Sequence, residues 1–263
     1  MSNLIGISGK IRSGKDTIGK IIQIITNYPK ITTKRIVENL DKETSNNKYK
    51  IKKFADALKD CVCIIIGCTR LDLENQEFKD TPLGLEWGIF KDGEEYDLTP
   101  RDILQLLGTE CGRNIIHPNI WINAAFADYI VQSKVHNHED KEFSFNSYYC
   151  RCHTCYKQFS SKNKKAFMCK SCVEKQVDTY PNWIFTDNRF PNDLEAIKSR
   201  GGITIRVNRK SKNHLIFETK GISPHESEIS LDNSEFDYVI DNNESIENLI
   251  IQVKDILISE KII

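Results

Sequence analysis

The sequence lacks a long apolar run. Its uninterrupted apolar stretches, such as Val62–Ile66, are far shorter than the ~20 residues that a membrane-spanning helix needs. Met1 is followed by a short strand pattern, whereas a secretory leader has a basic segment and then a long apolar one. We therefore expect no contact with a membrane and a cytoplasmic location, within a host cell if the protein is viral.

An excess of charge of one sign is also missing. The chain has 37 Lys and Arg residues against 37 Asp and Glu residues. No global field therefore draws the whole chain to nucleic acid or to an anionic surface. Any such contact has to be made by a local patch.

Apolar residues are plentiful enough for an ordinary core, since they make up 39% of 263 residues. Helical periodicity and short strand-like runs alternate along the chain. Strands are expected at 3–9, 183–187, 203–207 and 236–240, and helices at about 14–25, 99–112, 120–131, 191–200 and 246–257. This alternation predicts an α/β fold with a doubly wound, mostly parallel sheet, helices on both faces, and ligands at the carboxyl ends of the strands.

Residues 133–181 interrupt this pattern. They contain five of the nine cysteines and many lysines, and they show little helical or strand periodicity. We predict an insertion at 133–181 within a discontinuous domain formed by residues 1–132 and 182–263. Residues 27–53 are polar and rich in charge, so we expect them at the surface.

The segment Gly9–Lys15 fits the phosphate-loop pattern G-x-x-x-x-G-K. It follows an expected strand and opens an expected helix, where backbone N–H groups and the helix N-terminus favour bound phosphate. Lys15 is then expected to bridge the β- and γ-phosphates of a nucleotide. A glycine-rich turn with an incidental lysine is the alternative. The predicted ATP-binding residues are Gly9, Arg12, Ser13, Gly14, Lys15, Asp16 and Thr17.

Asp16 departs from the usual pattern, which has Ser or Thr after the lysine to hold Mg²⁺. Three roles stay open for it: a direct metal ligand, a ligand through water, or a group that orients an attacking oxygen. We expect ATP and Mg²⁺ as cofactors, with Asp16 as the metal ligand.

Residues 8–17, Ser-Gly-Lys-Ile-Arg-Ser-Gly-Lys-Asp-Thr, resemble the loops of deoxynucleoside monophosphate kinases from large phages and large DNA viruses. The resemblance spans 3–132 and about 182–257, and the cysteine-rich insertion is the main departure from it. Further segments resemble motifs of this family in the same order: FADALK at 54–59, TPRDILQLLGTE at 99–110 with Arg113 and Trp121, TDNRFPND at 186–193, and HESE at 225–228.

The resemblance implies a P-loop kinase fold and ATP-dependent conversion of a deoxynucleoside 5′-monophosphate (dNMP) to the diphosphate, which supplies precursors for DNA synthesis. It also makes a homodimer reasonable. It gives no role for His225 and Glu226. The implied catalytic residues are Lys15, Asp16 and Arg189, and the implied dNMP-binding residues are Lys10, Arg101, Gln105, Thr109, Arg113, Trp121, Asp187 and Arg189.

Phosphoryl transfer requires cations that converge on the transferred group. By the resemblance, Arg113 binds the acceptor phosphate and Arg189 the transferred phosphoryl group. Arg206 and Arg209 are further candidates. For each arginine, a solvated surface charge is the alternative.

Two other residues have two interpretations each. Asp187 ends an apolar strand-like run, the position from which a P-loop enzyme often places a carboxylate near Mg²⁺; an acid that caps a helix or lies in a loop is the alternative. Trp121 either stacks on the acceptor base, whose edge Gln105 or Thr109 would then bind, or lies in the core.

Two Cys-x-x-Cys pairs in the insertion are separated by 13 residues, slightly fewer than in the common zinc ribbon but enough for a hairpin to bring them together. They predict a structural Zn²⁺ without catalytic function, since a closed Cys₄ site has no open position. Cys150 or His153 are alternative ligands, and a redox pair is the other interpretation. The insertion is rich in Lys and Arg, and two interpretations of this basic ribbon stay open: a weak contact with nucleic acid or a protein, or a solvated surface. The expected zinc ligands are Cys152, Cys155, Cys169 and Cys172.

Two other functions stay open. A loop that ends in Gly-Lys-Asp also occurs in phosphomevalonate kinases, so another small-molecule P-loop kinase is possible. The second is an NTPase that binds nucleic acid through the basic ribbon. The acceptor and the salt dependence of any DNA binding distinguish them from a dNMP kinase.

Overall fold

The computed structural model describes residues 3–42, 46–91, 93–129, 148–151, 158–161, 180–210 and 229–263. The chain divides into two compact units. One consists of Met1–Ala127 and Asn182–Ile263, and the other of Asp128–Pro181.

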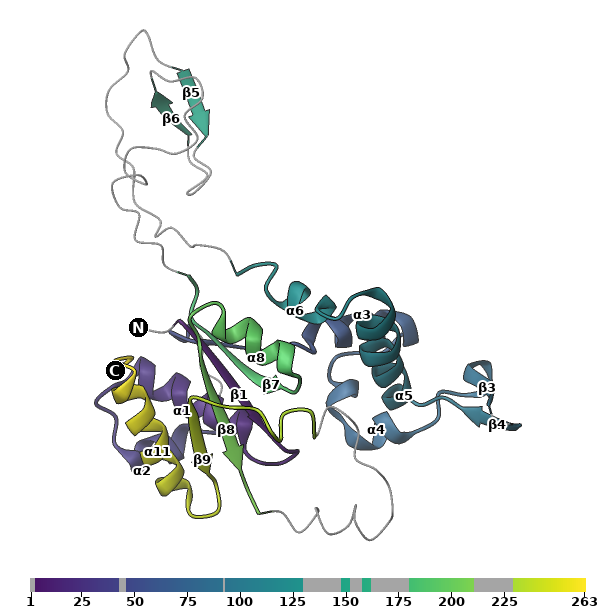
Figure 1. Ribbon diagram of the computed structural model, residues 1–263, viewed down its shortest axis with the longest axis horizontal. Helices are drawn as coiled ribbons and strands as arrows, with labels where there is room; N and C mark the ends of the chain where they lie inside the picture. Colours follow the sequence, from purple (N-terminus) through teal and green to yellow (C-terminus); the bar gives the residue numbers. More distant parts are fainter. Residues whose placement is uncertain are drawn as a thin grey trace. The chain divides into compact units, whose positions relative to one another are not determined.

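The larger unit is a mixed α/β structure built on a five-stranded sheet (Figure 1). All four strand pairings in this sheet are parallel. The mostly parallel α/β fold predicted from the alternating pattern is thereby confirmed. The strands, in their order across the sheet, are β2 (Lys50–Lys52), β7 (Trp183–Asn188), β1 (Leu4–Gly9), β8 (Ile203–Asn208) and β9 (Tyr238–Asp241).

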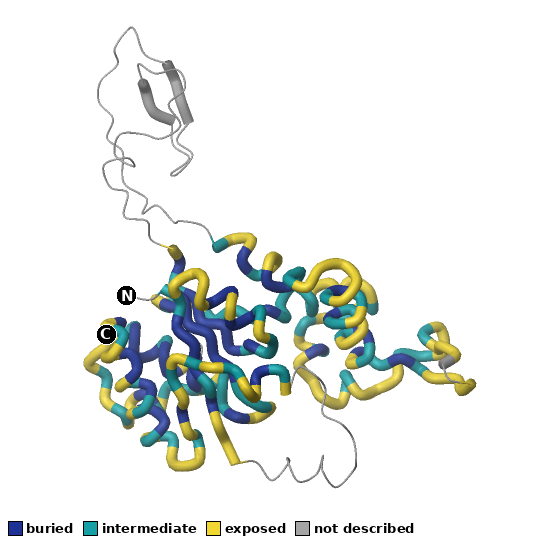
Figure 2. The backbone as a smooth tube through the Cα atoms, in the orientation of Figure 1, coloured by how far each residue is buried: buried dark blue, intermediate teal, exposed yellow. Residues whose placement is uncertain are grey.

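Helices cover both faces of this sheet. Ile5 and Ile7 of β1 share a buried cluster with the apolar sides of two helices, α1 (Lys15–Asn27) and α11 (Ile246–Ser259). On the opposite face lies α8 (Pro191–Lys198), whose Ile197 comes so close that a Cβ on Gly6 would lie 3.0 Å from it. The short helix α2 (Thr33–Asn39) packs beside α11. The central strands are the most deeply buried part of the unit (Figure 2).

A second buried cluster of Val62, Leu73, Leu98 and Ile103 holds the helices between β2 and β7 together. A short antiparallel hairpin lies within the same stretch. The elements are α3 (Asp56–Ile66), η1 (Asp72–Glu74), α4 (Gln76–Asp80), η2 (Leu85–Trp87), β3 (Gly88–Lys91), β4 (Glu94–Asp97), α5 (Pro100–Gln105), η3 (Leu106–Ile116) and α6 (Ile120–Ala125).

The helix expected at 99–112 begins as predicted, because Thr99 and Asp102 form a capping box around Pro100. It does not continue as one α-helix. From Leu106 onward the chain winds as the π-helix η3, which packs closely against its neighbours. A Cβ on Gly112 would lie 3.0 Å from the indole of Trp121.

In the smaller unit, the strands β5 (Tyr148–Arg151) and β6 (Gln158–Ser161) pair antiparallel. The rings of Tyr129 and Tyr180 stack with centroids 5.1 Å apart. Across both units, none of the helices in the described part of the chain has the length and apolar character needed to cross a membrane.

Candidate functional site at the ends of β1 and β7

The loop Gly9–Lys15 connects the central strand β1 to α1. The geometry of the loop requires glycine at two positions. A Cβ on Gly9 would lie 2.5 Å from the Oγ of Ser13 and 2.6 Å from the carbonyl oxygen of Val207. Gly14 has a φ of 102°, a conformation that other L-residues rarely adopt. The tight curvature of this loop therefore requires glycine at both positions.

Lys15 folds back over this loop. Its ammonium donates hydrogen bonds of 2.7 Å to the Gly9 carbonyl and 2.8 Å to the Lys10 carbonyl. The cation therefore lies against the loop at the N-terminus of α1, whose N–H groups and dipole attract anions. A phosphate oxygen at this position would compete with the two carbonyls for the same ammonium.

Ser13 and Asn242 complete the inner wall of the loop. The side-chain amide of Asn242, which follows β9, donates a 2.8 Å hydrogen bond to the Ser13 carbonyl. The Ser13 hydroxyl is buried and has no hydrogen-bond partner among the described residues. An unsatisfied buried hydroxyl is costly, so this group is available to a polar ligand in the loop.

Asp16, the first acidic residue of α1, is bound to the neighbouring strand. The Thr186 hydroxyl donates a 2.7 Å hydrogen bond to Asp16 Oδ1, and the Lys53 ammonium lies 3.4 Å from the same oxygen. Burial raises the pKa of Asp16, but the Thr186 hydrogen bond and the charges of Lys53 and Lys15 outweigh it. The resulting pKa lies below its ordinary value, so Asp16 is ionised at neutral pH.

The expected metal cofactors need correction here. In the described ranges, no group of three or more His, Cys, Asp or Glu side chains could hold a metal ion. The expectation of Mg²⁺ at Asp16 is therefore wrong, and the physical reason is that Thr186 and Lys53 already engage the carboxylate. The predicted Zn²⁺ ligands Cys152, Cys155, Cys169 and Cys172 lie outside the described residues, as do His153, His225 and Glu226.

Lys53 is a candidate site residue that the sequence patterns did not identify. It follows β2, and its ammonium approaches the first turn of α1 through Asp16. The only local sign of a role for Lys53 is the pair Lys52-Lys53 before the FADALK segment. Charged pairs on an edge strand are too common to indicate a site. The parallel sheet brings Lys53 to the site because β2 ends at the same edge as β1 and β7.

Asp187, at the end of β7, accepts hydrogen bonds from the backbone N–H groups of Phe54 and Ala55, at 2.9 and 3.0 Å. These residues immediately precede α3, so the carboxylate fixes the start of that helix. Burial raises the pKa of Asp187 to about 6, although the two backbone hydrogen bonds act in the opposite direction. Of its two sequence-based interpretations, the geometry matches the helix cap.

Arg113 packs against the turn between β7 and α8. The Arg113 guanidinium lies 4.0 Å from the ring centroid of Phe190 and 3.2 Å from the carboxylate of Asp193. Its side chain is 12% exposed, whereas that of Asp193 is 1% exposed. Arg113 is thus brought next to Arg189 and Phe190, the residues that follow β7.

The other expected acceptor-side residues are distributed along α5, η3 and α6. The indole N–H of Trp121 donates a 2.8 Å hydrogen bond to the Gly108 carbonyl, and its side chain is buried. This is the core position that was the alternative to base stacking. Arg101 pairs with Asp80 at 2.6 Å at the surface. Gln105 is exposed and Thr109 is partly buried.

Arg206 and Arg209 of the β8 end also approach the loop. Arg206 donates a 3.2 Å hydrogen bond to the Ser8 hydroxyl, and Arg209 donates a 3.4 Å hydrogen bond to the Arg12 carbonyl. Lys10 forms a 2.5 Å ion pair with Asp232. The loop is therefore flanked by cations from β1, β2 and β8.

No protein-family model and no curated protein matches the chain.

Proposed function

We propose that the chain is a P-loop kinase that transfers the γ-phosphoryl group of ATP to a deoxynucleoside 5′-monophosphate, giving the diphosphate and ADP. The observation that carries the proposal is the position of Lys15, whose ammonium is held over a glycine-dependent loop at the N-terminus of α1. The enzyme works in the cytoplasm as a homodimer and supplies precursors for DNA synthesis.

The donor side is the loop Gly9–Lys15. Backbone N–H groups, the dipole of α1 and the Lys15 ammonium all favour the negative charge of a bound phosphate chain. The buried Ser13 hydroxyl adds a further polar group that is available to a ligand. Charge neutralisation of this kind is the main demand of phosphoryl transfer, because the transition state spreads negative charge over the transferred group.

The acceptor side lies beside β7 and is formed by the helices from α3 to α6. Arg113, ordered by Asp193 and Phe190, supplies a cation for the acceptor phosphate, and Arg189 supplies one for the transferred group. The Asp187 cap joins β7 to α3 and so fixes the acceptor side relative to the sheet. Arginine suits both roles because its planar group binds two phosphate oxygens at once.

The experiment that tests this proposal measures ADP release from ATP in the presence of dNMPs, the matching ribonucleotides and phosphomevalonate. The variants are Lys15→Ala and, as a matched control, Lys20→Ala, which removes an exposed lysine from the same helix. We expect turnover with at least one dNMP that falls at least ~10²-fold in Lys15→Ala and is unchanged in Lys20→Ala.

Turnover with phosphomevalonate alone would show that the acceptor is phosphomevalonate and not a dNMP. An absence of ADP release with every acceptor, together with a salt-dependent affinity for DNA, would favour a nucleic-acid-binding NTPase instead.

A further inference from the structure

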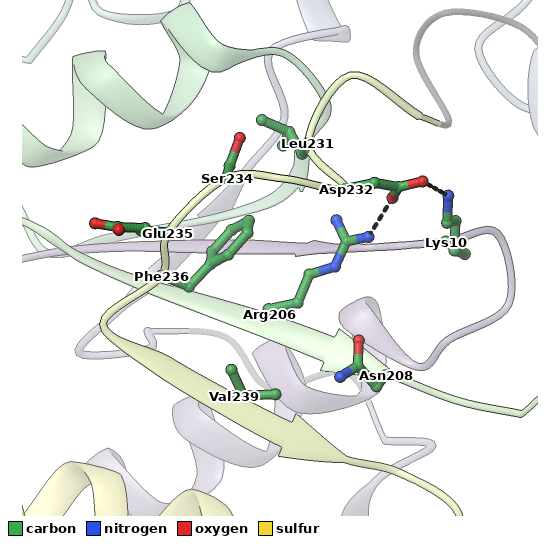
Figure 3. A pocket seen from close by; sticks show the side chains of 9 residues that line it. All are labelled: Lys10, Arg206, Asn208, Leu231, Asp232, Ser234, Glu235, Phe236 and Val239. Carbon is green, nitrogen blue, oxygen red and sulfur yellow. Dashed lines mark hydrogen bonds and ion pairs between the residues drawn. The ribbon is translucent and has the colours of Figure 1, made fainter.

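A carboxylate from the C-terminal part of the chain bridges two cations beside the loop. One oxygen of Asp232 lies 2.5 Å from the Lys10 ammonium, and the other lies 2.8 Å from the guanidinium of Arg206 (Figure 3). Lys10 belongs to the loop and Arg206 to β8. The two cations would repel each other without this shared counter-ion.

These contacts close a ring around the start of the loop. Arg206 also donates a 3.2 Å hydrogen bond to the hydroxyl of Ser8, near the end of β1. The Lys10 carbonyl accepts hydrogen bonds from the Lys15 ammonium at 2.8 Å and from the Ser13 N–H at 3.2 Å. Asp232 thus holds Lys10, whose carbonyl accepts hydrogen bonds from the Lys15 ammonium and from the Ser13 N–H in the turn of the loop.

The segment that carries Asp232 is itself attached to α8 and β8. Leu231 is buried, and the carbonyl of Glu235 accepts a 2.9 Å hydrogen bond from the Lys198 ammonium of α8. Asp237 accepts hydrogen bonds from the N–H and hydroxyl of Thr204, at 2.8 and 2.7 Å. Asp232 is therefore a fixed point against which a loop side chain can be oriented.

A cavity of about 600 Å³ opens next to this group of charges, between β8, β9 and the segment 231–236 (Figure 3). The side chain of Asp232 is 38% exposed at its edge. Because the carboxylate is not enclosed, its replacement by an amide leaves no buried, unpaired group. The charge of Asp232 is therefore open to substitution without loss of the fold.

We infer that Asp232 is a positioning residue for the phosphoryl transfer proposed above, on which this inference rests. It acts through Lys10: the ion pair fixes the first turn of the loop, and this turn places the Lys15 ammonium. Its contribution is made to the transition state, which depends on the position of Lys15, more than to the binding of ATP.

The test compares kcat and KM for ATP in the wild type, Asp232→Asn and Asp232→Glu. The matched control is Glu235→Gln, which removes a negative charge from the same segment and cavity edge. We expect Asp232→Asn to lower kcat about 10-fold or more with a change in KM below about 3-fold, since a displaced catalytic group costs mainly kcat. Asp232→Glu should restore most of kcat, and Glu235→Gln should equal the wild type.

A second variant tests whether Asp232 acts through Lys10, and it does not depend on how well Asp232→Asn folds. Lys10→Met should lower kcat about as much as Asp232→Asn, and the double variant should be no slower than the slower single variant. Effects that multiply in the double variant would overturn the inference.

The outcomes for the inference and for the proposed function are distinct. An active wild type with an unaffected or faster Asp232→Asn overturns the inference alone and leaves Asp232 as a simple counter-ion. A wild type that phosphorylates no acceptor overturns the proposed function and the inference with it.

Discussion

The hydroxyl of Thr186 donates a 2.7 Å hydrogen bond to the carboxylate of Asp16, which joins β7 to the first turn of α1. The Lys53 ammonium approaches the same carboxylate oxygen at 3.4 Å. The ends of the parallel strands β2 and β7 therefore meet the first turn of α1 through these side chains. The Asp16 carboxylate therefore pairs with a cation of the protein itself, the Lys53 ammonium.

Lys53 is expected to contribute to turnover. Lys53→Gln removes a positive charge beside Asp16 and should lower kcat about 10-fold to 100-fold, in the range found when one charge-stabilising group is lost. Steady-state kinetics with the best dNMP measures this effect. Lys50→Gln is the control, because Lys50 is an exposed residue of β2, the strand that Lys53 follows. Equal activities of the two variants would remove Lys53 from the site.

Gly14 is expected to be required for nucleotide binding as well as for stability. Gly14→Ala places a Cβ 2.5 Å from the Asn242 amide and strains a backbone with a φ of 102°. Gly67, with a φ of 69° and no atom within 4 Å of an added Cβ, is the matched control. The backbone strain should cost each alanine variant about 1–2 kcal/mol of unfolding free energy.

If the proposed function holds, only Gly14→Ala should also weaken ATP binding, by at least ~10-fold, because only its loop is proposed to bind phosphate. Chemical denaturation and titration calorimetry measure the two quantities. A Gly67→Ala variant that loses as much ATP affinity would show that strain alone explains the loss.

Trp121 is expected to support the fold without selecting the base. Trp121→Phe keeps most of the apolar surface but leaves the buried Gly108 carbonyl without its indole donor. We expect a loss of about 1–3 kcal/mol in unfolding free energy. The KM values for different dNMPs should keep their ratios. A variant of unchanged stability with altered base preference would restore the stacking role.

Asp187 is expected to make stability depend on pH. Its pKa is raised from 3.8 to about 6 by burial, so between these values the unfolded chain releases a proton that the folded chain retains. Stability due to Asp187 therefore falls as pH rises through this window, by up to about 3 kcal/mol. Asp193 and Arg189 face the same carboxylate and are unchanged in the test.

Asp187→Asn lacks this titration. The unfolding free energy of the wild type minus that of the variant should thus decrease from pH 4 to pH 7, as followed by urea denaturation. A difference that is flat or increases over this range would contradict a raised pKa.

The regular elements follow largely from local patterns. The strands around Ile5, Ile184 and Ile205 are short apolar runs, and the buried side of α11 recurs at helical spacing. The start of α5 after Thr99 follows from the capping residues Thr99 and Asp102. The π-helix η3 has no such local signal, and its glycines pack closely against side chains of other helices, Leu58 and Trp121.

Much of the candidate site depends on contacts between distant parts of the chain. The loop and Lys15 are recognisable because their residues are contiguous. Asp232 has no local signal, since its partner Lys10 is 222 positions away and Arg206 is 26 positions away. Asp16 was misassigned to a metal for the same reason: Thr186, which occupies its carboxylate, is 170 positions away.

The edge strand β2 has a consequence for the behaviour of the protein in concentrated solution. It is three residues long, and two of them are Lys50 and Lys52. An unpaired strand edge is a template on which another molecule can add a strand, and short, lysine-bearing edges oppose this. Lys50 and Lys52, which come just before Lys53, therefore also protect the sheet from aggregation at its exposed edge.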